Sequence, residues 1–233
     1  KKILLPNNFQ YVDELKEDLS TASLSKTSIK TARRGKNIRL TELAFQNAKN
    51  YIKSNMKSEK EIDLKLDNIK KILGLDNTPR RIECFDISNT QGSNPVGSMI
   101  TFINGKPNKG LYKRFKVQTQ GPNDYAMMEE VVSRRLKRIG QVGWEKPDLI
   151  LIDGGRGHLN KIYKILNSNI SIASIAKPSK SAKIDRIYLP HEKASVDFSN
   201  NLEELKILIN ARDEAHRFAI TFHKLKRKEA MFL

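Results

Sequence analysis

The spacing of apolar residues divides the chain into a helical first part and a sheet-rich second part. Residues 1–78 predict a short helix from Tyr11, a short strand at 28–31, a helix from Leu40 and another that ends near Gly74. We expect the apolar positions of the two later helices to be core faces: Leu43, Ala44, Ala48, Ile52, Ile62, Leu66, Ile69, Ile72 and Leu73. The pattern therefore predicts a mainly helical supporting segment over residues 1–78.

Strand and helix patterns alternate from residue 79 onward. Apolar runs at 82–87, 97–103 and 111–117 are separated by short connections rich in turn-forming residues, which predicts three antiparallel strands. The run 149–152 is apolar throughout, as is typical of a central strand buried on both faces. Helices are predicted at 125–139, in the segment after Gly157 and from Leu202 onward, with two more strands at 170–176 and 186–190.

Acidic residues occur at the ends of two of these strands. Asp86 lies near the end of the first, and Asp153 directly follows the central one, while Asp213 and His216 are on the last helix. This order is that of the ribonuclease H-like fold, an α/β fold with a mixed five-stranded sheet flanked by helices. The first and fourth strands are neighbours in such a sheet, so Asp86 and Asp153 should meet, with His216 delivered by the helix.

These residues suit a divalent metal site. Two carboxylates about 4 Å apart repel by roughly 4 kcal/mol at an effective dielectric constant of 20, and a cation removes that cost. Oxygen ligands favour Mg²⁺ or Mn²⁺, and an imidazole shifts the preference slightly toward Mn²⁺. Because a bound cation can activate water and stabilise a phosphodiester under attack, Asp86, Asp153 and His216 predict a metal-dependent nuclease.

The charge of the chain favours a polyanionic partner. There are 43 Lys and Arg residues against 26 Asp and Glu, a formal net charge of +17. A lysine-rich soluble surface is the alternative. No apolar run is long enough to span a membrane, and the glycines around Arg156 lack the spacing of a nucleotide-cofactor loop. Six residues are candidate nucleic-acid contacts: Arg33, Arg34, Lys36, Arg156, Lys177 and Arg212.

Several single residues have two interpretations. Asp124 lies where a helix N-cap belongs, so it is either a cap or a site acid. Asp213 either orients His216 or pairs with Arg217. Cys84 is expected to be a buried apolar residue rather than a nucleophile. We treat the remaining histidines as structural, with a phosphate contact as the alternative for the last of them: His158, His191 and His223.

Four segments in this order resemble the carboxy-terminal endonuclease domain of the UvrC family, the nuclease component of the bacterial excinuclease. They are residues 83–88 (ECFDIS), 123–128 (NDYAMM), 149–157 (LILIDGGRG) and 212–219 (RDEAHRFA). The resemblance implies a ribonuclease H-like endonuclease domain over residues 79–233, with Asp86, Asp153 and His216 as its catalytic triad and Asp124 as a further functional acid. The chain departs from the usual family pattern at His158, where Gln is usual, and at Pro178, where Gly is usual.

The resemblance also implies a cellular role. Members of this family make the incision on the 5′ side of a lesion during nucleotide excision repair, in the bacterial cytoplasm. The implied partners are damaged double-stranded DNA and UvrB, the helicase component of the excinuclease. UvrB would bind through regions that are absent from this chain. We therefore expect this chain to be one domain of a larger protein. Two alternatives stay open: a non-catalytic basic DNA-binding or scaffold domain with the same fold, and a ribonuclease that acts on RNA/DNA hybrids.

Overall fold

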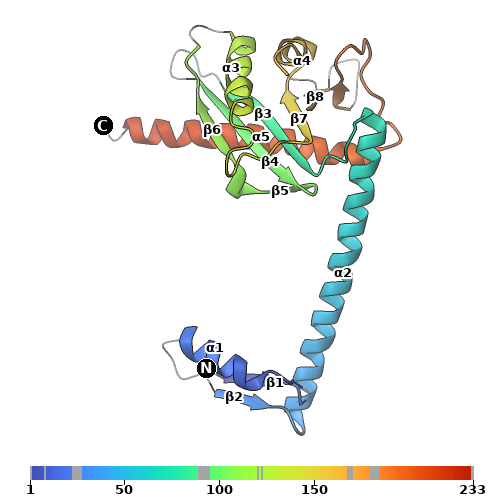
Figure 1. Ribbon diagram of the computed structural model, residues 1–233, viewed down its shortest axis with the longest axis vertical. Helices are drawn as coiled ribbons and strands as arrows, with labels where there is room; N and C mark the ends of the chain where they lie inside the picture. Colours follow the sequence, from blue (N-terminus) through green and yellow to red (C-terminus); the bar gives the residue numbers. More distant parts are fainter. Residues whose placement is uncertain are drawn as a thin grey trace. The chain divides into compact units, whose positions relative to one another are not determined.

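The first sixty residues form a small unit of their own. A computed structural model describes residues 2–7, 9–22, 28–88, 95–119, 121, 123–166, 170–178 and 184–231, which divide into compact units at 1–60 and 61–233. The first unit contains the parallel strands β1 (Lys2–Leu5) and β2 (Ser28–Thr31), helix α1 (Val12–Ala22) and the start of α2 (Lys36–Leu73) (Figure 1). The strand at 28–31 and the helix after Tyr11 were predicted, whereas β1 was not.

Helix α2 is one continuous helix of 38 residues, not the two helices expected. Its sequence contains neither glycine nor proline, so nothing interrupts the backbone hydrogen bonds. It ends at Gly74, whose φ of +60° suits glycine, and the Leu75 N–H donates to the Lys70 carbonyl oxygen at 2.9 Å. This closing turn is a Schellman motif.

The two ends of α2 differ in burial. Leu43 and Ile52 are 59% and 57% exposed, so the core face expected there is wrong for the described structure. Leu66, Ile69 and Leu73 are buried in the core of the second unit. Because these last turns pack there, the second unit begins at Glu61, earlier than the boundary predicted at residue 79.

The second unit is built on a mixed sheet. Within the described residues it has seven strands, in the order β5-β4-β3-β7-β8-β9, with β6 also paired to β4. Strand β3 is antiparallel to β4 and parallel to β7, which confirms the predicted contact between the first and fourth strands of the domain. The sheet exceeds the predicted five strands because the strand predicted at 186–190 joins it as β9 and β5, which was not predicted, extends the opposite side. Bounds are β3 (Arg81–Ser88), β4 (Val96–Ile103), β5 (Lys106–Pro107), β6 (Lys113–Lys116), β7 (Leu149–Asp153), β8 (Ser171–Ala176) and β9 (Arg186–Tyr188).

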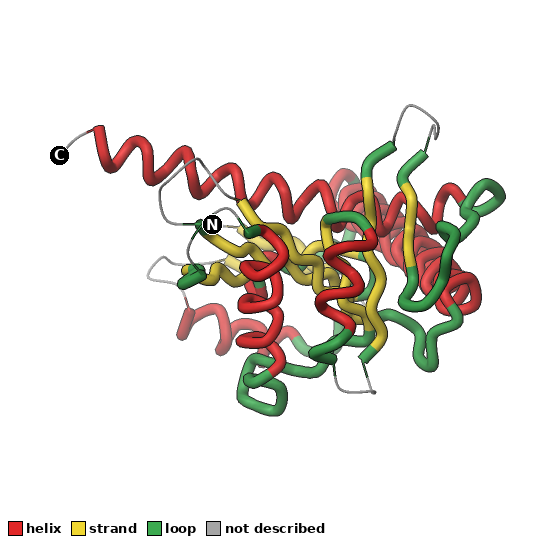
Figure 2. Tube along the Cα trace, turned by 90° about the horizontal axis from the view of Figure 1, so that it is seen from above, coloured by secondary structure: helices red, strands yellow, loops and turns green. Residues whose placement is uncertain are grey.

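Helices cover both faces of this sheet (Figures 1 and 2). Helix α5 (Leu202–Met231) covers one face, where it packs on residues such as Cys84, which is buried as expected. Helices α3 (Asp124–Leu136) and α4 (Arg156–Tyr163) cover the other, where they pack on residues such as Phe85. A short 3₁₀ helix, η1 (Lys109–Leu111), precedes β6. None of the described helices is long and apolar enough to cross a membrane.

A buried ion pair fastens α3 to the sheet. Glu83 of β3 and Arg135 of α3 are both fully buried, and two guanidinium N–H groups donate to the carboxylate at 2.7 and 2.8 Å. Near the middle of α3, the backbone of Gly97 in β4 lies so close to Val131 that no Cβ would fit. These contacts fix the position of α3 and of Asp124 at its first turn.

Candidate metal centre

Three side chains from distant parts of the sequence converge at one edge of the sheet. Asp86 is near the end of β3 and Asp153 is the last residue of β7, and the parallel register pairs their preceding neighbours, Phe85 and Ile152. His216 comes from α5. One ligand atom from each of the three lies within 4.8 Å of the others. The geometry thus brings together the three residues that the sequence analysis selected.

A cross-strand row continues from this site toward β6. Asp86 is paired with Ser98 on β4, and Ser98 with Arg114 on β6, so the three side chains point to the face that α5 covers. The buried Ser98 hydroxyl is within hydrogen-bonding distance of the carbonyl oxygens of Asp86, at 3.3 Å, and Ala215, at 3.4 Å. It therefore ties α5 to the strand that carries Asp86. Ser98 was not predicted as a site residue, because its only signal in the sequence is a hydroxyl in an apolar run.

The site concentrates negative charge in a partly buried place. Burial raises the pKa of Asp86, and the nearby His216 partly offsets this rise. Burial and then the charge of Asp86 raise the pKa of Asp153 to about 6. The Nδ1 atom of His216 lies 3.4 Å from Oδ2 of Asp86, and its ring is 49% exposed. A bound cation would stabilise the ionised forms of these two acids, which otherwise disfavour each other's ionisation.

Arg212 of α5 is buried next to this site and forms ion pairs with two acids. It is 6% exposed, donates to Asp213 at 2.7 Å and forms an ion pair with Asp185. Its charge lowers the pKa of Asp153. With its guanidinium buried and engaged by two carboxylates, Arg212 is better suited to holding the site than to contacting a phosphate. Asp185, which precedes β9, gave no signal in the sequence.

The role expected for Asp213 is corrected by the same contacts. Asp213 pairs with Arg212, whereas Arg217 pairs with Glu214, with an Nε–Oε2 distance of 2.6 Å. Neither of the two interpretations of Asp213, orienting His216 or pairing with Arg217, matches these contacts. The reason is geometric, because the exposed side chain of Asp213 contacts the guanidinium of the adjacent, buried Arg212.

Asp124 is not the cap of its helix. Asn123 holds the N-cap position, and its side chain accepts a hydrogen bond from the Ala126 N–H at 3.1 Å. Asp124 is the first residue of α3 and is exposed. Next to it, the ring of Tyr125 stacks on His158 of α4, with centroids 4.3 Å apart. Burial lowers the pKa of His158, and the charge of Asp124 opposes that effect.

The candidate nucleic-acid contacts fall in different places. Arg33, Arg34 and Lys36 are exposed around the turn at Gly35 in the first unit. In the second unit Lys177 is exposed just after β8, and its charge lowers the pKa of both Asp86 and Asp153. Arg156 is exposed at the start of α4. The side chain of His223 lies outside the described residues, so that expectation is untouched.

Comparison with known proteins agrees with the motifs. A family profile described as the UvrC RNAse H endonuclease domain matches residues 70–220. The chain belongs to this family. The resemblance noted from the four motifs is thereby confirmed, and so is the expected mixed sheet flanked by helices. The UvrC family match begins within the last turn of α2, which is consistent with packing of that turn in the core of the second unit.

Two curated relatives carry the name UvrABC system protein C. The one from Geobacter metallireducens is 38% identical over 245 residues, which cover 99% of this chain and 40% of the relative. The one from Flavobacterium psychrophilum is 41% identical over 203 residues, which cover 82% of this chain and 33% of the relative. The chain thus spans two fifths or less of the length of these UvrC proteins.

Solved structures share the architecture only loosely. Endonuclease V from Bacillus subtilis has a TM-score of 0.43 and 10% sequence identity, over 70% of this chain and 91% of that one. The catalytic domain of human endonuclease V has a TM-score of 0.38 and 10% identity, over 64% of this chain and 84% of that one. Similarity at this level assigns no function to the UvrC domain.

Proposed function

We propose that this chain is a divalent-metal-dependent DNA endonuclease domain that makes the 5′ incision beside a lesion in bacterial nucleotide excision repair. The observation that carries the proposal is the convergence of Asp86, Asp153 and His216, with ligand atoms within 4.8 Å of one another. Membership of an endonuclease domain family and the basic charge of the chain support it.

The three converging residues fit Mg²⁺ or Mn²⁺. Two carboxylates and one imidazole are an oxygen-rich donor set. Burial and then the charge of Asp86 raise the pKa of Asp153, and a bound cation would offset both effects. In this proposal Asp86, Asp153 and His216 hold the metal. When bound, the metal would supply positive charge for the phosphodiester and lower the pKa of a water molecule.

Hydrolysis forms one bond and breaks another. A water molecule loses a proton and its oxygen bonds to phosphorus, while the bond from phosphorus to the leaving sugar oxygen breaks and that oxygen takes up a proton. Asp86 is held in place for this reaction by the contact of Ser98 with the Asp86 and Ala215 carbonyl groups. The Nδ1 atom of His216 lies 3.4 Å from Oδ2 of Asp86, so a nitrogen of this half-exposed ring would complete the ligand set beside the two carboxylates.

We propose damaged double-stranded DNA as the substrate and UvrB, the helicase component of the excinuclease, as the partner of the complete protein. The net charge of +17 suits binding to DNA through its phosphates. Because phosphate contacts do not depend on the DNA sequence, partner proteins would locate the lesion. The proposed phosphate contacts include Arg156 and Lys177, which are exposed, with Arg33, Arg34 and Lys36 as further candidates. The bacterial cytoplasm is the proposed location.

The test compares cleavage and binding in one variant. Asp86→Asn should reduce cleavage of a bubble-containing duplex at least about a hundredfold in Mg²⁺ or Mn²⁺, because it removes a charged ligand, while DNA affinity stays within about threefold. Asp76→Asn changes an exposed acid that has no part in the site and is the matched control. Cleavage is measured on labelled bubble, matched-duplex and RNA/DNA hybrid substrates.

The alternatives predict different results. A non-catalytic scaffold would bind the bubble substrate but show no metal-dependent cleavage in the wild-type chain, so Asp86→Asn would change nothing. A hybrid-specific ribonuclease would cut the RNA/DNA hybrid in preference to the bubble. Either result would overturn the proposed repair incision.

A further inference from the structure

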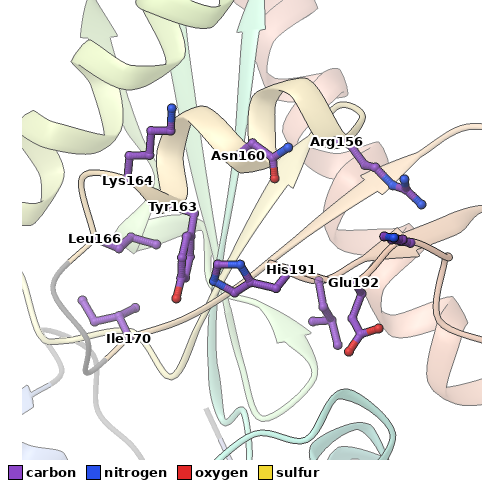
Figure 3. A pocket seen from close by; sticks show the side chains of 10 residues that line it. Arg156, Asn160, Tyr163, Lys164, Leu166, Ile170, His191 and Glu192 are labelled. Carbon is purple, nitrogen blue, oxygen red and sulfur yellow. The ribbon is translucent and has the colours of Figure 1, made fainter.

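A cavity of about 860 Å³ opens beside α4, on the face of the sheet opposite α5 (Figure 3). Helix α4 lines it with Arg156 and Tyr163, and Lys164 follows at the helix end. These residues, seven and eight positions apart, share one face of the helix. The segment after β9 lines it from the other side, with His191 and Lys193. The volume lies in the range that small-molecule and nucleotide ligands occupy in proteins.

The cavity adjoins the edge of the sheet where Asp153 lies. Arg156 is three residues after Asp153, and three residues of chain cannot span more than about 11 Å. The end of the cavity that Arg156 lines is therefore within about 11 Å of Asp153 along the backbone, and the cavity extends from there along α4. A DNA strand that passes the metal centre on this side would meet its rim.

Its wall carries an excess of positive charge. Arg156, Lys164 and Lys193 face a single acid, Glu192, among the described residues that line the cavity. Within the described part of the chain, no carboxylate lies within ion-pair distance of Lys164 or Lys193. Their ammonium groups are exposed and available to a phosphate.

The wall also carries aromatic rings next to these cations. The rings of Tyr163 and His191 come from opposite sides and meet edge to face, with centroids 4.8 Å apart (Figure 3). Tyr163 is 40% exposed, so part of its ring is free to stack. The Arg156 guanidinium lies 5.0 Å from the centre of the Tyr188 ring. Aromatic rings interleaved with cations are the surface on which single-stranded nucleotides stack.

We propose that this cavity binds one nucleotide of the DNA strand next to the incision site, with its base against Tyr163 and His191 and its phosphate on Lys164 or Lys193. The proposal rests on the DNA endonuclease function proposed above. It adds a nucleotide subsite on one defined side of the metal centre, between α4 and the segment after β9.

Photocrosslinking locates the nucleotide directly. The full chain with Asp86→Asn, which keeps the DNA intact, is bound to bubble duplexes that carry 5-iododeoxyuridine at successive positions around the incision site. Mass spectrometry then identifies the crosslinked residue. We expect one position, or two adjacent ones, to crosslink to Tyr163 or His191. Crosslinks that map only to residues outside the cavity would overturn the proposal.

Binding of matched variants tests the energetics. Tyr163→Ala should weaken DNA binding roughly tenfold because a stacking partner is removed, whereas Tyr163→Phe, which keeps the ring, should bind like the wild type. The double variant Lys164→Ala with Lys193→Ala should show a shallower slope of log affinity against log salt concentration. We expect the slope to fall by about 0.7 for each phosphate that the two substitutions leave without a cation. Tyr51→Ala and Lys71→Ala change exposed residues that do not line the cavity and are the controls.

The outcomes separate this inference from the proposed function. If the wild-type chain cuts DNA and all cavity variants bind and cut equally well, only the nucleotide subsite is overturned. If the wild-type chain neither binds nor cuts DNA, the proposed function fails and the subsite fails with it. Crosslinks in the cavity together with the loss of affinity in Tyr163→Ala and its recovery in Tyr163→Phe support the subsite.

Discussion

At the scale of single residues, Asp153 combines function with a cost to stability. Burial and the neighbouring Asp86 raise its pKa to about 6, compared with 3.8 for an ordinary aspartate. The folded chain therefore holds a proton on Asp153 at pH values where the unfolded chain has lost it. The contribution of Asp153 to the free energy of unfolding consequently falls as the pH rises from about 4 to about 6, and it stays low above that range.

Asp153→Asn should stabilise the metal-free chain. In EDTA at pH 7.5 we expect a gain of about 1–2 kcal/mol in the free energy of unfolding, after allowance for solvent screening of a partly exposed group. The gain should vanish below about pH 3, where wild-type Asp153 is protonated in both the folded and the unfolded states. Urea denaturation of both proteins across this pH range measures it.

Added Mn²⁺ is the control for that prediction. Only the wild-type chain retains the full ligand set, so Mn²⁺ should raise its stability more than that of Asp153→Asn. If Asp153→Asn were less stable than the wild type in EDTA at every pH, the repulsion inferred at this site would be wrong.

At the scale of elements, the packing of β4 against α3 depends on the absence of a side chain. A Cβ on Gly97 would lie 2.4 Å from a methyl carbon of Val131. Gly97→Ala should therefore destabilise the chain by about 1–3 kcal/mol, because Val131 and α3 would have to shift. Thermal or urea denaturation measures the effect.

Gly110→Ala is the matched control. A Cβ there meets only the Asn108 side-chain oxygen, at 3.5 Å, which is an ordinary contact. We expect a change within about 0.5 kcal/mol. Equal losses in the two variants would mean that the approach of α3 to β4 does not decide the stability.

Strand β6 offers a second basic surface beside the metal centre. Arg114 is two strands away from Asp86 in the same cross-strand row, and its guanidinium lies 4.3 Å from the centre of the Phe218 ring on α5. The ring restricts the position of this exposed cation before any ligand binds. We infer that Arg114 contacts a phosphate of the bound DNA.

Arg114→Ala should weaken DNA binding and reduce the slope of log affinity against log salt concentration by about one, uniformly across DNA sequences. Fluorescence anisotropy at several salt concentrations measures both quantities. Lys71→Ala, which removes an exposed cation elsewhere in the second unit, should leave the slope unchanged. An unaltered slope in Arg114→Ala would exclude the contact.

At the scale of the whole molecule, the second unit should be self-sufficient. Its core is built from residues 61–233, including the last turns of α2, and it contains all three residues of the candidate metal centre. A chain of residues 61–233 should therefore unfold cooperatively and gain stability from Mn²⁺ as the full chain does. Calorimetry with and without the metal tests this.

A start at residue 79 is the informative comparison. That chain lacks Leu66, Ile69 and Leu73, which are buried in the core, so it should be several kcal/mol less stable or fail to fold. If both chains were equally stable, the end of α2 would not belong to the domain.

Local patterns in the sequence located the helices and strands and singled out the converging acids. Unbroken apolar runs, turn residues and helical spacing are local signals, and they located the main strands and helices of the second unit. Because the order of elements implied that β3 and β7 are neighbours in the sheet, the meeting of Asp86 with Asp153 followed from the sequence as well. The resemblance of four motifs to a known family led to the same three residues.

The roles of the surrounding residues depend on contacts between distant segments. Whether Asn123 or Asp124 caps α3 depends on one turn of backbone geometry, and whether Arg212 is free depends on Asp185, 27 residues away in the sequence. The apolar face near Leu43 and Ile52 has the same periodicity as a core face, but nothing in the described structure buries it. Periodicity reports which residues share a face, whereas burial, ion pairing and the cavity beside α4 depend on contacts between segments that no local pattern encodes.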